Sequence, residues 1–374
     1  MSTPDDLPEP DRLEGAPHPR AAAQLHGHAS AEAAFLEAFN AGRLHHGWLI
    51  GGPRGIGKAT LAWRMARFLL AQPAPGAGLF AAPEPETLDL PADHPVGARL
   101  RATGTDPGLM VIRRGWDEKT RRLRAVITVE ETRRLQRFFA MSSSDGGWRV
   151  VIVDAADEMN LNAANALLKS LEEPPARAVL LLVAHQPSAL LPTVRSRCRA
   201  LPLAPLGAGD LAAALAQAGV APGDDPAALA ELAGGSVGAA IRLLEAGGLA
   251  LYAELVALFG AAPGIDRAAA HRLADRAAAR GAEDRFDLTV ALTELFLTRA
   301  ARAGVTGPPA VEAAPGEHAA LARLSPNTAA ARAWATAQAE IPARARQARA
   351  VNLDPSAIVL DMVLRVDTTA RDIR

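Results

Sequence analysis

The chain has 374 residues, a nearly balanced charge and a single cysteine, and these properties exclude several classes of protein. Its length exceeds that of one ordinary domain and indicates two or three. With 40 basic and 41 acidic residues, it lacks the positive charge of an autonomous nucleic-acid binder, so any DNA contact is expected to be local or shared with partner subunits. Cys198 alone can form neither an internal disulfide nor a multi-cysteine zinc site.

Neither a secretory signal nor a membrane span is predicted. Residues 1–20 are polar, acidic and rich in proline, which predicts a disordered leader. No apolar run reaches the roughly 20 residues that a spanning helix needs. We therefore expect a cytoplasmic protein with no membrane partner.

The first half of the chain alternates between strand and helix patterns, which predicts a parallel α/β sheet over residues 21–206. Helices are expected at 29–41, directly after a glycine-rich loop near residue 58, from 128 to 139, where Thr128 and Glu131 form a capping box, and at 162–171. Buried strands are expected at 48–50, 150–153 and 179–184. Residues 71–96 read as an irregular insertion, and 109–113 is expected to pair with 124–127.

After Pro202 strand signals disappear and alanine-rich helical patterns replace them. Three short helices are expected within 207–247, followed by longer helices over 248–374. A Pro/Ala/Gly segment at 304–316 is expected to be flexible. Asp354 and Pro355 form a good N-cap and first helical position for a final helix through Leu364.

A glycine-rich loop follows the first predicted strand and precedes a predicted helix, which is the context that a phosphate-binding P-loop requires. The loop consists of Gly52, Pro53, Arg54, Gly55, Ile56, Gly57, Lys58, Ala59 and Thr60. Its glycines let backbone N–H groups turn toward a phosphate, and the helix dipole and Lys58 add positive charge. The position after the lysine should carry a Mg²⁺-binding hydroxyl, but Ala59 has none and Thr60 comes one residue late. The alternative is a glycine turn without a ligand.

The end of the strand at 150–153 supplies a second candidate. Asp154 lies where a carboxylate of the Mg²⁺ shell is found beside a P-loop, although it could also be an ordinary turn residue. The next residue is Ala155, where hydrolysing enzymes of this type carry a Glu that polarises water. Asp157 and Glu158 are expected at the N-terminus of the next helix.

Two further positions concern arginines. Arg197 lies between Ser196 and Cys198 after the last strand of the α/β region. It could be a surface residue, or it could reach the γ-phosphate of a neighbouring subunit. Gly238 stands where a phosphate-sensing arginine would be useful, and Arg242 follows one turn later.

Three runs together resemble bacterial clamp-loader subunits, and within that family the delta-prime group of DNA polymerase III most of all. The runs are residues 44–53, 165–175, which read NALLKSLEEPP, and 196–198, which read SRC. The resemblance covers most of the first 245 residues and is weaker for the last helices. It implies an AAA+ domain over 21–206, a small helical lid over 207–247 and a helical collar over 248–374 that joins subunits.

The resemblance also implies partners and a role. Clamp loaders use ATP to open a sliding clamp and place it on primed DNA, as part of a DNA polymerase holoenzyme. The expected partners are delta and gamma/tau type subunits in a heteropentameric ring, with the clamp and DNA contacted through the complex. Members of the delta-prime group do not hydrolyse ATP, and the arginine of their SRC motif acts on the ATP site of an adjacent subunit. In this chain that residue is Arg197.

The departures from the catalytic pattern agree with this assignment. Ala59 lacks the metal-binding hydroxyl, Ala155 lacks the water-activating carboxylate and Gly238 lacks the sensor arginine. His185 stands where small polar residues usually end the sensing strand. Nucleotide binding remains open on the sequence, and any ATP or ADP that binds is expected not to be hydrolysed. We expect no zinc, because the insertion from Ala71 contains no cysteine.

Two other functions remain open on the sequence. The chain could be a self-sufficient AAA+ ATPase, such as a catalytic clamp-loader subunit or a DNA motor. It could also be a P-loop kinase, although nothing after Pro202 supplies a polar substrate lid.

Overall fold

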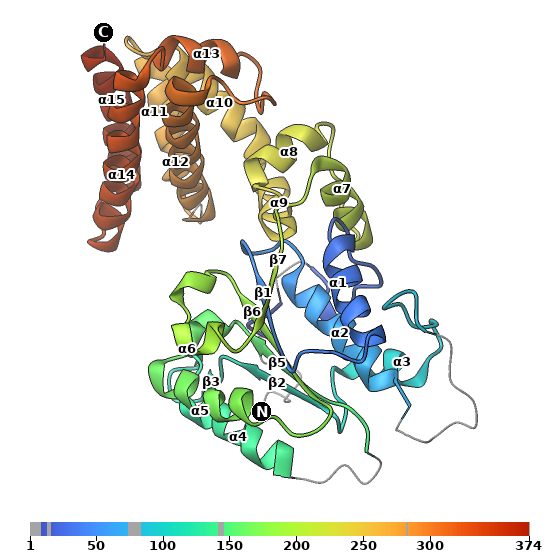
Figure 1. Cartoon of the computed structure of the whole chain (residues 1–374). Coiled ribbons are helices and arrows are strands. Elements are labelled where there is room, and N and C mark those ends of the chain that lie inside the picture. Colours follow the sequence, from blue (N-terminus) through green and yellow to red (C-terminus); the bar gives the residue numbers. More distant parts are fainter. Residues whose placement is uncertain (1–8, 13–15, 74–83, 141–145, 282, 374) are drawn as a thin grey trace. The chain divides into compact units, whose positions relative to one another are not determined.

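The computed structural model describes residues 9–12, 16–73, 84–140, 146–281 and 283–373 (Figure 1). The chain forms two compact units. The first contains residues 1–221 with 236–238, and the second contains residues 222–235 with 239–374. The expected α/β fold followed by an all-α region is confirmed. The finer division at 206/207 and 247/248 stays a prediction.

A five-stranded parallel sheet forms the centre of the first unit, in the order β2-β5-β6-β1-β7. Its strands are β1 (Gly47–Gly51), β2 (Leu109–Arg113), β5 (Arg149–Asp154), β6 (Ala178–Ala184) and β7 (Arg199–Pro202). Every residue of β1, β5 and β6 is buried, as expected for central parallel strands covered on both faces.

Helices cover both faces of this sheet, and alternate residues of each strand supply the two cores (Figure 1). Trp48 and Ile50 of β1 pack with α1 (Ala29–Asn40), α2 (Lys58–Ala71) and α3 (Pro95–Thr103). Leu49 packs on the opposite face with α4 (Val129–Ala140), α5 (Leu161–Glu172) and α6 (Pro192–Arg195). Its described residues also form the 3₁₀ turns η2 (Pro19–Ala21), η3 (Ala156–Glu158) and η4 (Pro187–Ala189), and the helix α7 (Ala208–Gln217).

One predicted strand pairing is wrong. Residues 109–113 do form a strand, but β2 joins the edge of the main sheet beside β5 rather than pairing with 124–127. The hairpin in this region is smaller and consists of β3 (Trp116–Asp117) and β4 (Arg122–Leu123). Apolar residues at 109–112 gain more by packing against the buried β5 than by pairing across an exposed, charged turn.

The predicted leader (residues 1–20) and the predicted insertion (residues 71–96) are each partly ordered where the structure describes them. Residues 1–8 and 13–15 of the predicted leader lie outside the described residues. Residues 9–12 and 16–20 contact the first unit, where Asp11 forms an ion pair with Arg113. The insertion from Ala71 to Val96 includes residues 74–83, which lie outside the described residues, and it ends in α3, whose first residue is Pro95.

The second unit is all-helical (Figure 1). Its helices are α8 (Pro226–Ala233), α9 (Val237–Glu245, of which the first two residues belong to the first unit), α10 (Gly248–Gly260), α11 (Arg267–Ala277), α12 (Glu283–Thr306), α13 (Glu317–Leu324), α14 (Thr328–Ala350) and α15 (Pro355–Asp372). Asp354 caps α15 by accepting a hydrogen bond from the Ala357 amide, as predicted, but the helix continues past Leu364. No single described helix is long and apolar enough to cross a membrane. Only α8 and α9 taken together reach that length and apolar composition, and they are bent by 114° relative to each other.

A buried ionic cluster fixes the segment before α13. Glu317 has no exposed surface and binds Arg299 of α12 through two hydrogen bonds of 2.6 and 3.0 Å. Its carboxylate also accepts the Ala313 amide, and Arg299 donates to the Val311 carbonyl at 2.9 Å. The part of 304–316 that was expected to be flexible is therefore anchored, and α12 itself extends to Thr306.

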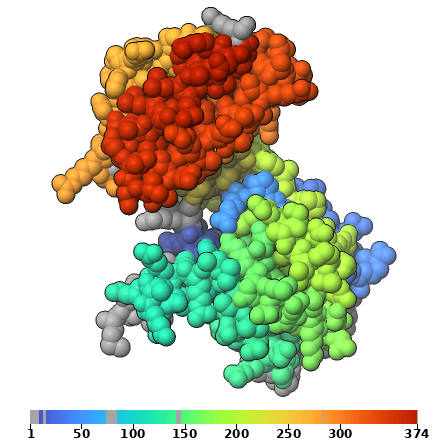
Figure 2. All heavy atoms as spheres, turned by 90° about the vertical axis from the view of Figure 1, so that its left-hand side faces the viewer, coloured from blue at the N-terminus to red at the C-terminus, as the bar shows by residue number. Residues whose placement is uncertain are grey.

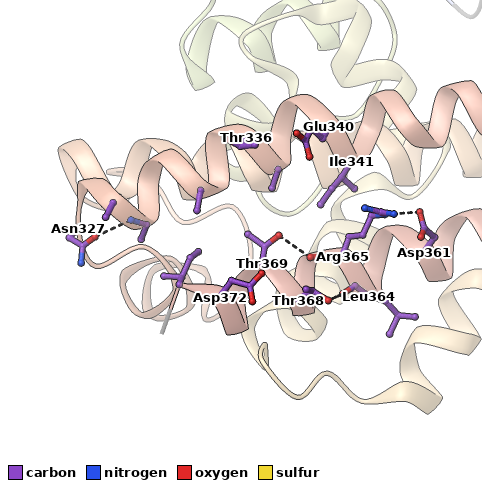
Figure 3. Close-up of a pocket in the computed structure, with 15 residues that line it drawn as sticks. Asn327, Thr336, Glu340, Ile341, Asp361, Leu364, Arg365, Thr368, Thr369 and Asp372 are labelled. Atoms are coloured by element: carbon purple, nitrogen blue, oxygen red, sulfur yellow. Dashed lines mark hydrogen bonds and ion pairs between the residues drawn. The ribbon is translucent and has the colours of Figure 1, made fainter.

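The outer helices α14 and α15 lie side by side and form the red face of the second unit (Figure 2). Between them lies an open groove of about 760 Å³. Figure 3 shows its lining, in which Asp361 pairs with Arg365 and the Thr369 hydroxyl bonds to the Arg365 carbonyl.

Candidate functional site

The carboxyl edge of the sheet brings together the P-loop and the carboxylate predicted beside it. Gly51 at the end of β1 is in register with Ala184 of β6, and Asp154 of β5 is in register with Val183. On its other side, Asp154 is in register with Arg113 of β2. Ligands of open parallel sheets bind at this edge.

The loop has the backbone of a phosphate cradle, and at three of its positions only glycine fits the backbone conformation. Gly52, Gly55 and Gly57 have φ values of 146°, 76° and 103°. A Cβ on Gly52 would lie 2.5 Å from the Leu203 carbonyl oxygen, and one on Gly55 would lie 2.2 Å from the Ser236 Oγ. The loop is therefore closely held by its neighbours rather than a loose glycine turn.

The other loop residues differ in their surroundings. Pro53 and Arg54 are exposed, and Arg54 pairs with Glu158 at 2.7 Å. Ile56 is fully buried, and its carbonyl lies 2.6 Å from the Nε2 atom of the buried His28. Ala59 and Thr60 lie in the first turn of α2.

Lys58 is 3% exposed, and its ammonium group donates a hydrogen bond to the Pro53 carbonyl of its own loop. Burial lowers the pKa of Lys58 to about 8, although Asp154 and Asp157 oppose this shift. Asp154 is 9% exposed, and burial, with the charge of Asp11 as the next cause, raises its pKa to about 7. The carboxylate is thus held where its charged form is disfavoured.

The placement predicted for Asp157 and Glu158 is wrong. They belong to the short turn η3, and the next helix, α5, begins at Leu161 with Asn160 as its N-cap. Asp157 instead accepts hydrogen bonds from the backbone amides of His185 and Gln186 after β6. Burial, with the Lys58 charge second, lowers the pKa of His185 to about 4, so this imidazole is neutral near pH 7.

The residues present fit a phosphate better than they fit Mg²⁺. Three glycines with positive φ and the lysine at the start of α2 supply the cradle. The metal side is poorer, because Ala59 has no oxygen that could bind Mg²⁺. Among the described residues, no group of three or more His, Cys, Asp or Glu side chains is arranged to hold a metal ion. The expectation of no zinc stays a prediction from the cysteine count.

The residues just before Gly238 contact the P-loop. The amide of Val237, the first residue of α9, donates to the Gly55 carbonyl at 2.9 Å. The Gly238 backbone nitrogen lies 3.2 Å from where a Gly55 Cβ would stand. A side chain at position 238 would therefore begin close to the loop, but glycine offers none.

Arg197 lies at the opposite edge of the sheet, in the turn between α6 and β7. Its carbonyl oxygen would be 3.0 Å from a Cβ on Gly47, the first residue of β1. The guanidinium donates to the Thr193 carbonyl at 2.9 Å and pairs with Glu172 at 2.8 Å. Its side chain is 36% exposed. The structure therefore holds this guanidinium at the surface, away from the chain's own P-loop.

Sequence patterns missed several of these neighbours. Glu172 is in the SLEEPP run, but no periodicity links it to Arg197. His28 and Asp11 reach the P-loop region from segments before the first strand. These contacts join residues that are far apart in the sequence, so helix and strand periodicity gave no signal for them.

Part of the chain is similar in sequence to known proteins. Residues 27–207 match the family model described as DNA polymerase III, delta subunit. This stretch is a little under half of the chain, and it is similar to the delta' subunits of DNA polymerase III. The matched stretch contains the P-loop, Asp154 and Arg197.

Several DNA polymerase III subunits are moderately similar to the chain. The DNA polymerase III subunit delta' of Pseudomonas aeruginosa is 42% identical over 153 residues, which are 41% of each chain. That of Escherichia coli is 34% identical over 211 residues, 56% of this chain and 58% of the relative. The gamma/tau subunit of Mycobacterium tuberculosis (strain H37Rv) is 31% identical over 184 residues, 49% of this chain and 28% of the relative. The chain thus spans about half the length of the delta' proteins it matches.

Proposed function

We propose that this chain acts in DNA replication as a non-hydrolysing delta-prime subunit of a DNA polymerase III clamp loader. In this role it joins delta and gamma/tau type subunits in a heteropentameric ring in the cytoplasm. The ring loads a sliding clamp onto primed DNA, and this chain contributes Arg197 to the ATP site of a neighbouring subunit. The similarity of residues 27–207 to the family model described as DNA polymerase III, delta subunit, supports the proposal.

The observation that carries the proposal is the position of Arg197. It lies beside Gly47, at the start of β1, whereas the P-loop follows Gly51, at the end of the same strand. Five residues of β-strand, or about 13 Å from the first Cα to the last, separate the two edges. Arg197 therefore does not face the chain's own phosphate cradle, and an arginine with a role in ATP chemistry at this place must serve another chain.

The chain's own nucleotide site supports the non-hydrolysing part of the proposal. The phosphate groups of ATP or ADP would be held by Gly52, Gly55, Gly57 and Lys58. These contacts contribute to binding but do not by themselves speed hydrolysis. The terms that speed hydrolysis are separate: a metal clamp, a positioned water and a charge sensor. Ala59, Ala155 and Gly238 lack the side chains that would supply them.

The second candidate is a self-sufficient AAA+ ATPase of the gamma/tau type. The similarity to gamma/tau subunits, at 31% identity, favours it to a degree. It would need a Mg²⁺ ligand in place of the hydroxyl that Ala59 lacks and a water-activating group in place of the carboxylate that Ala155 lacks.

A steady-state ATPase assay separates the two candidates. The isolated chain is expected to show no Mg²⁺-dependent turnover above that of a Lys58→Ala control. The same preparation, mixed with delta and gamma/tau type subunits, is expected to join a complex with DNA-dependent ATPase activity. Turnover by the isolated chain of about 1 s⁻¹, an ordinary enzyme rate, would rule out the delta-prime role.

A further inference from the structure

The segment before the first helix carries two acidic residues that are bound to the carboxyl edge of the sheet. The side chain of Asp11 is 1% exposed. One of its oxygens lies 2.6 Å from Arg113, and the other lies 3.1 Å from the buried His18. Glu9 binds Arg20 at 2.7 Å and Arg113 at 3.3 Å. Two carboxylates are thus fixed against the last residue of β2.

Residues 18–23 hold this acidic segment in place along α2. Arg67 of α2, 5% exposed, donates to the Arg20 and Ala22 carbonyls at 2.5 and 3.1 Å. Arg64, 4% exposed, donates to the Ala23 carbonyl at 2.7 Å. Such buried, charge-assisted hydrogen bonds are stronger than exposed ones.

This arrangement puts the acidic segment beside the metal side of the nucleotide site. Arg113, which binds both carboxylates, is in register with Asp154 in the sheet. Burial is the first cause that raises the pKa of Asp154, and the negative charge of Asp11 adds to it. Asp154 and Lys58, which would have to face a metal ion and phosphates, are only 9% and 3% exposed. Both side chains are therefore largely buried within the chain.

We propose that the segment carrying Glu9 and Asp11 is an internal occupant of the metal side of the P-loop site, and that nucleotide binds this chain only by displacing it. A triphosphate is negatively charged, so it is repelled by the two carboxylates and competes with them for the positive charge of Arg113. The inference concerns the chain's own P-loop. It stands or falls separately from the role of Arg197, because it can be tested on the isolated protein.

The test is equilibrium binding of a fluorescent ATP analogue with Mg²⁺ to the full chain. A Glu9→Ala/Asp11→Ala double variant is expected to bind at least about tenfold more tightly than the wild type. Adding Lys58→Ala should remove this gain, which locates the binding at the P-loop. An Asp284→Asn/Asp287→Asn variant, which removes two exposed carboxylates of α12, should bind like the wild type.

A second variant guards against a misfolded double mutant. A chain that begins at residue 13 lacks both carboxylates but keeps His18 and Arg20, and it should show the same gain. Equal affinity of the wild type and both variants would overturn the proposal. So would the absence of binding to both variants, since the acidic segment would then not be what keeps nucleotide out.

Discussion

Asp154 and Lys58 are both buried beside the P-loop, and burial acts on their pKa values in opposite directions. It raises the pKa of Asp154 from 3.8 to about 7 and lowers that of Lys58 from 10.5 to about 8. Between pH 4 and 7 the folded state therefore binds more protons at Asp154 than the unfolded state does. The contribution of Asp154 to the free energy of unfolding is therefore fully present below pH 4 and is lost as the pH rises through 7.

A neutral isostere tests this directly. Asp154→Asn is expected to match the wild type in stability near pH 4 and to exceed it at pH 7.5 by on the order of 2–4 kcal/mol, since one pKa unit corresponds to about 1.4 kcal/mol. The measurement is thermal unfolding at both pH values, with the exposed Asp224→Asn as a control. A variant that is no more stable than the wild type at pH 7.5 would show that Asp154 is not strained by burial.

At the scale of residues, the sequence identified candidates but not their partners. Lys58, Asp154 and Arg197 could be named because each occupies a fixed place relative to a strand or a motif. Their surroundings could not, because the contacts that set them come from distant segments. Asp11 near Asp154 and Glu172 beside Arg197 are examples. The roles of the named residues stay predictions until they are tested.

Among the elements, α12 and α14 meet so closely that a helical glycine is required. A Cβ on Gly304 of α12 would lie 2.5 Å from both the Asn327 carbonyl oxygen and the Ser325 Oγ, and 2.9 Å from the Ala331 Cβ. Asn327 is the N-cap of α14, so the contact also fixes where α14 begins.

This contact predicts a reversal of the usual effect of alanine in a helix. Gly304→Ala should destabilise the protein by about 1–3 kcal/mol because it overpacks the contact. Gly209→Ala in α7, where nothing lies within 4 Å of the new Cβ, should be neutral or stabilise by up to about 1 kcal/mol. Unfolding of both variants in urea compares them, and a stabilising Gly304→Ala would contradict the packing of α12 on α14.

The elements themselves were mostly predictable, and the exceptions have physical causes. Long apolar or amphipathic runs gave β5, β6, α4 and α5 within a residue or two of their ends. The short strand β7 was missed because residues 199–202 have no apolar run of their own and depend on pairing with β1. The strand β2 was found but given the wrong partner, since pairing between distant strands leaves no local signal.

At the scale of the whole chain, the carboxyl and amino edges of the five-stranded sheet carry different functional groups. The carboxyl edge carries a glycine-rich phosphate cradle without the Mg²⁺-binding hydroxyl at Ala59 or the carboxylate at Ala155, and Glu9 and Asp11 bind Arg113 at the same edge. The amino edge presents Arg197 at the surface, held by Thr193 and Glu172. The proposed division of labour is that this chain completes a neighbour's ATP site while its own site stays idle. The pair of Arg197 with Glu172 is partly exposed, so removing it should cost less than about 1 kcal/mol of stability.

The most direct test is ATP turnover by an assembled clamp loader in which only the ATP site next to this chain is intact, the P-loop lysines of the other sites having been replaced. Arg197→Ala is expected to lower DNA-dependent turnover at that site by about 10³-fold or more while leaving the chain folded and bound in the complex. Arg195→Ala, an exposed arginine two residues away, should leave turnover unchanged. Normal turnover with Arg197→Ala would contradict the account.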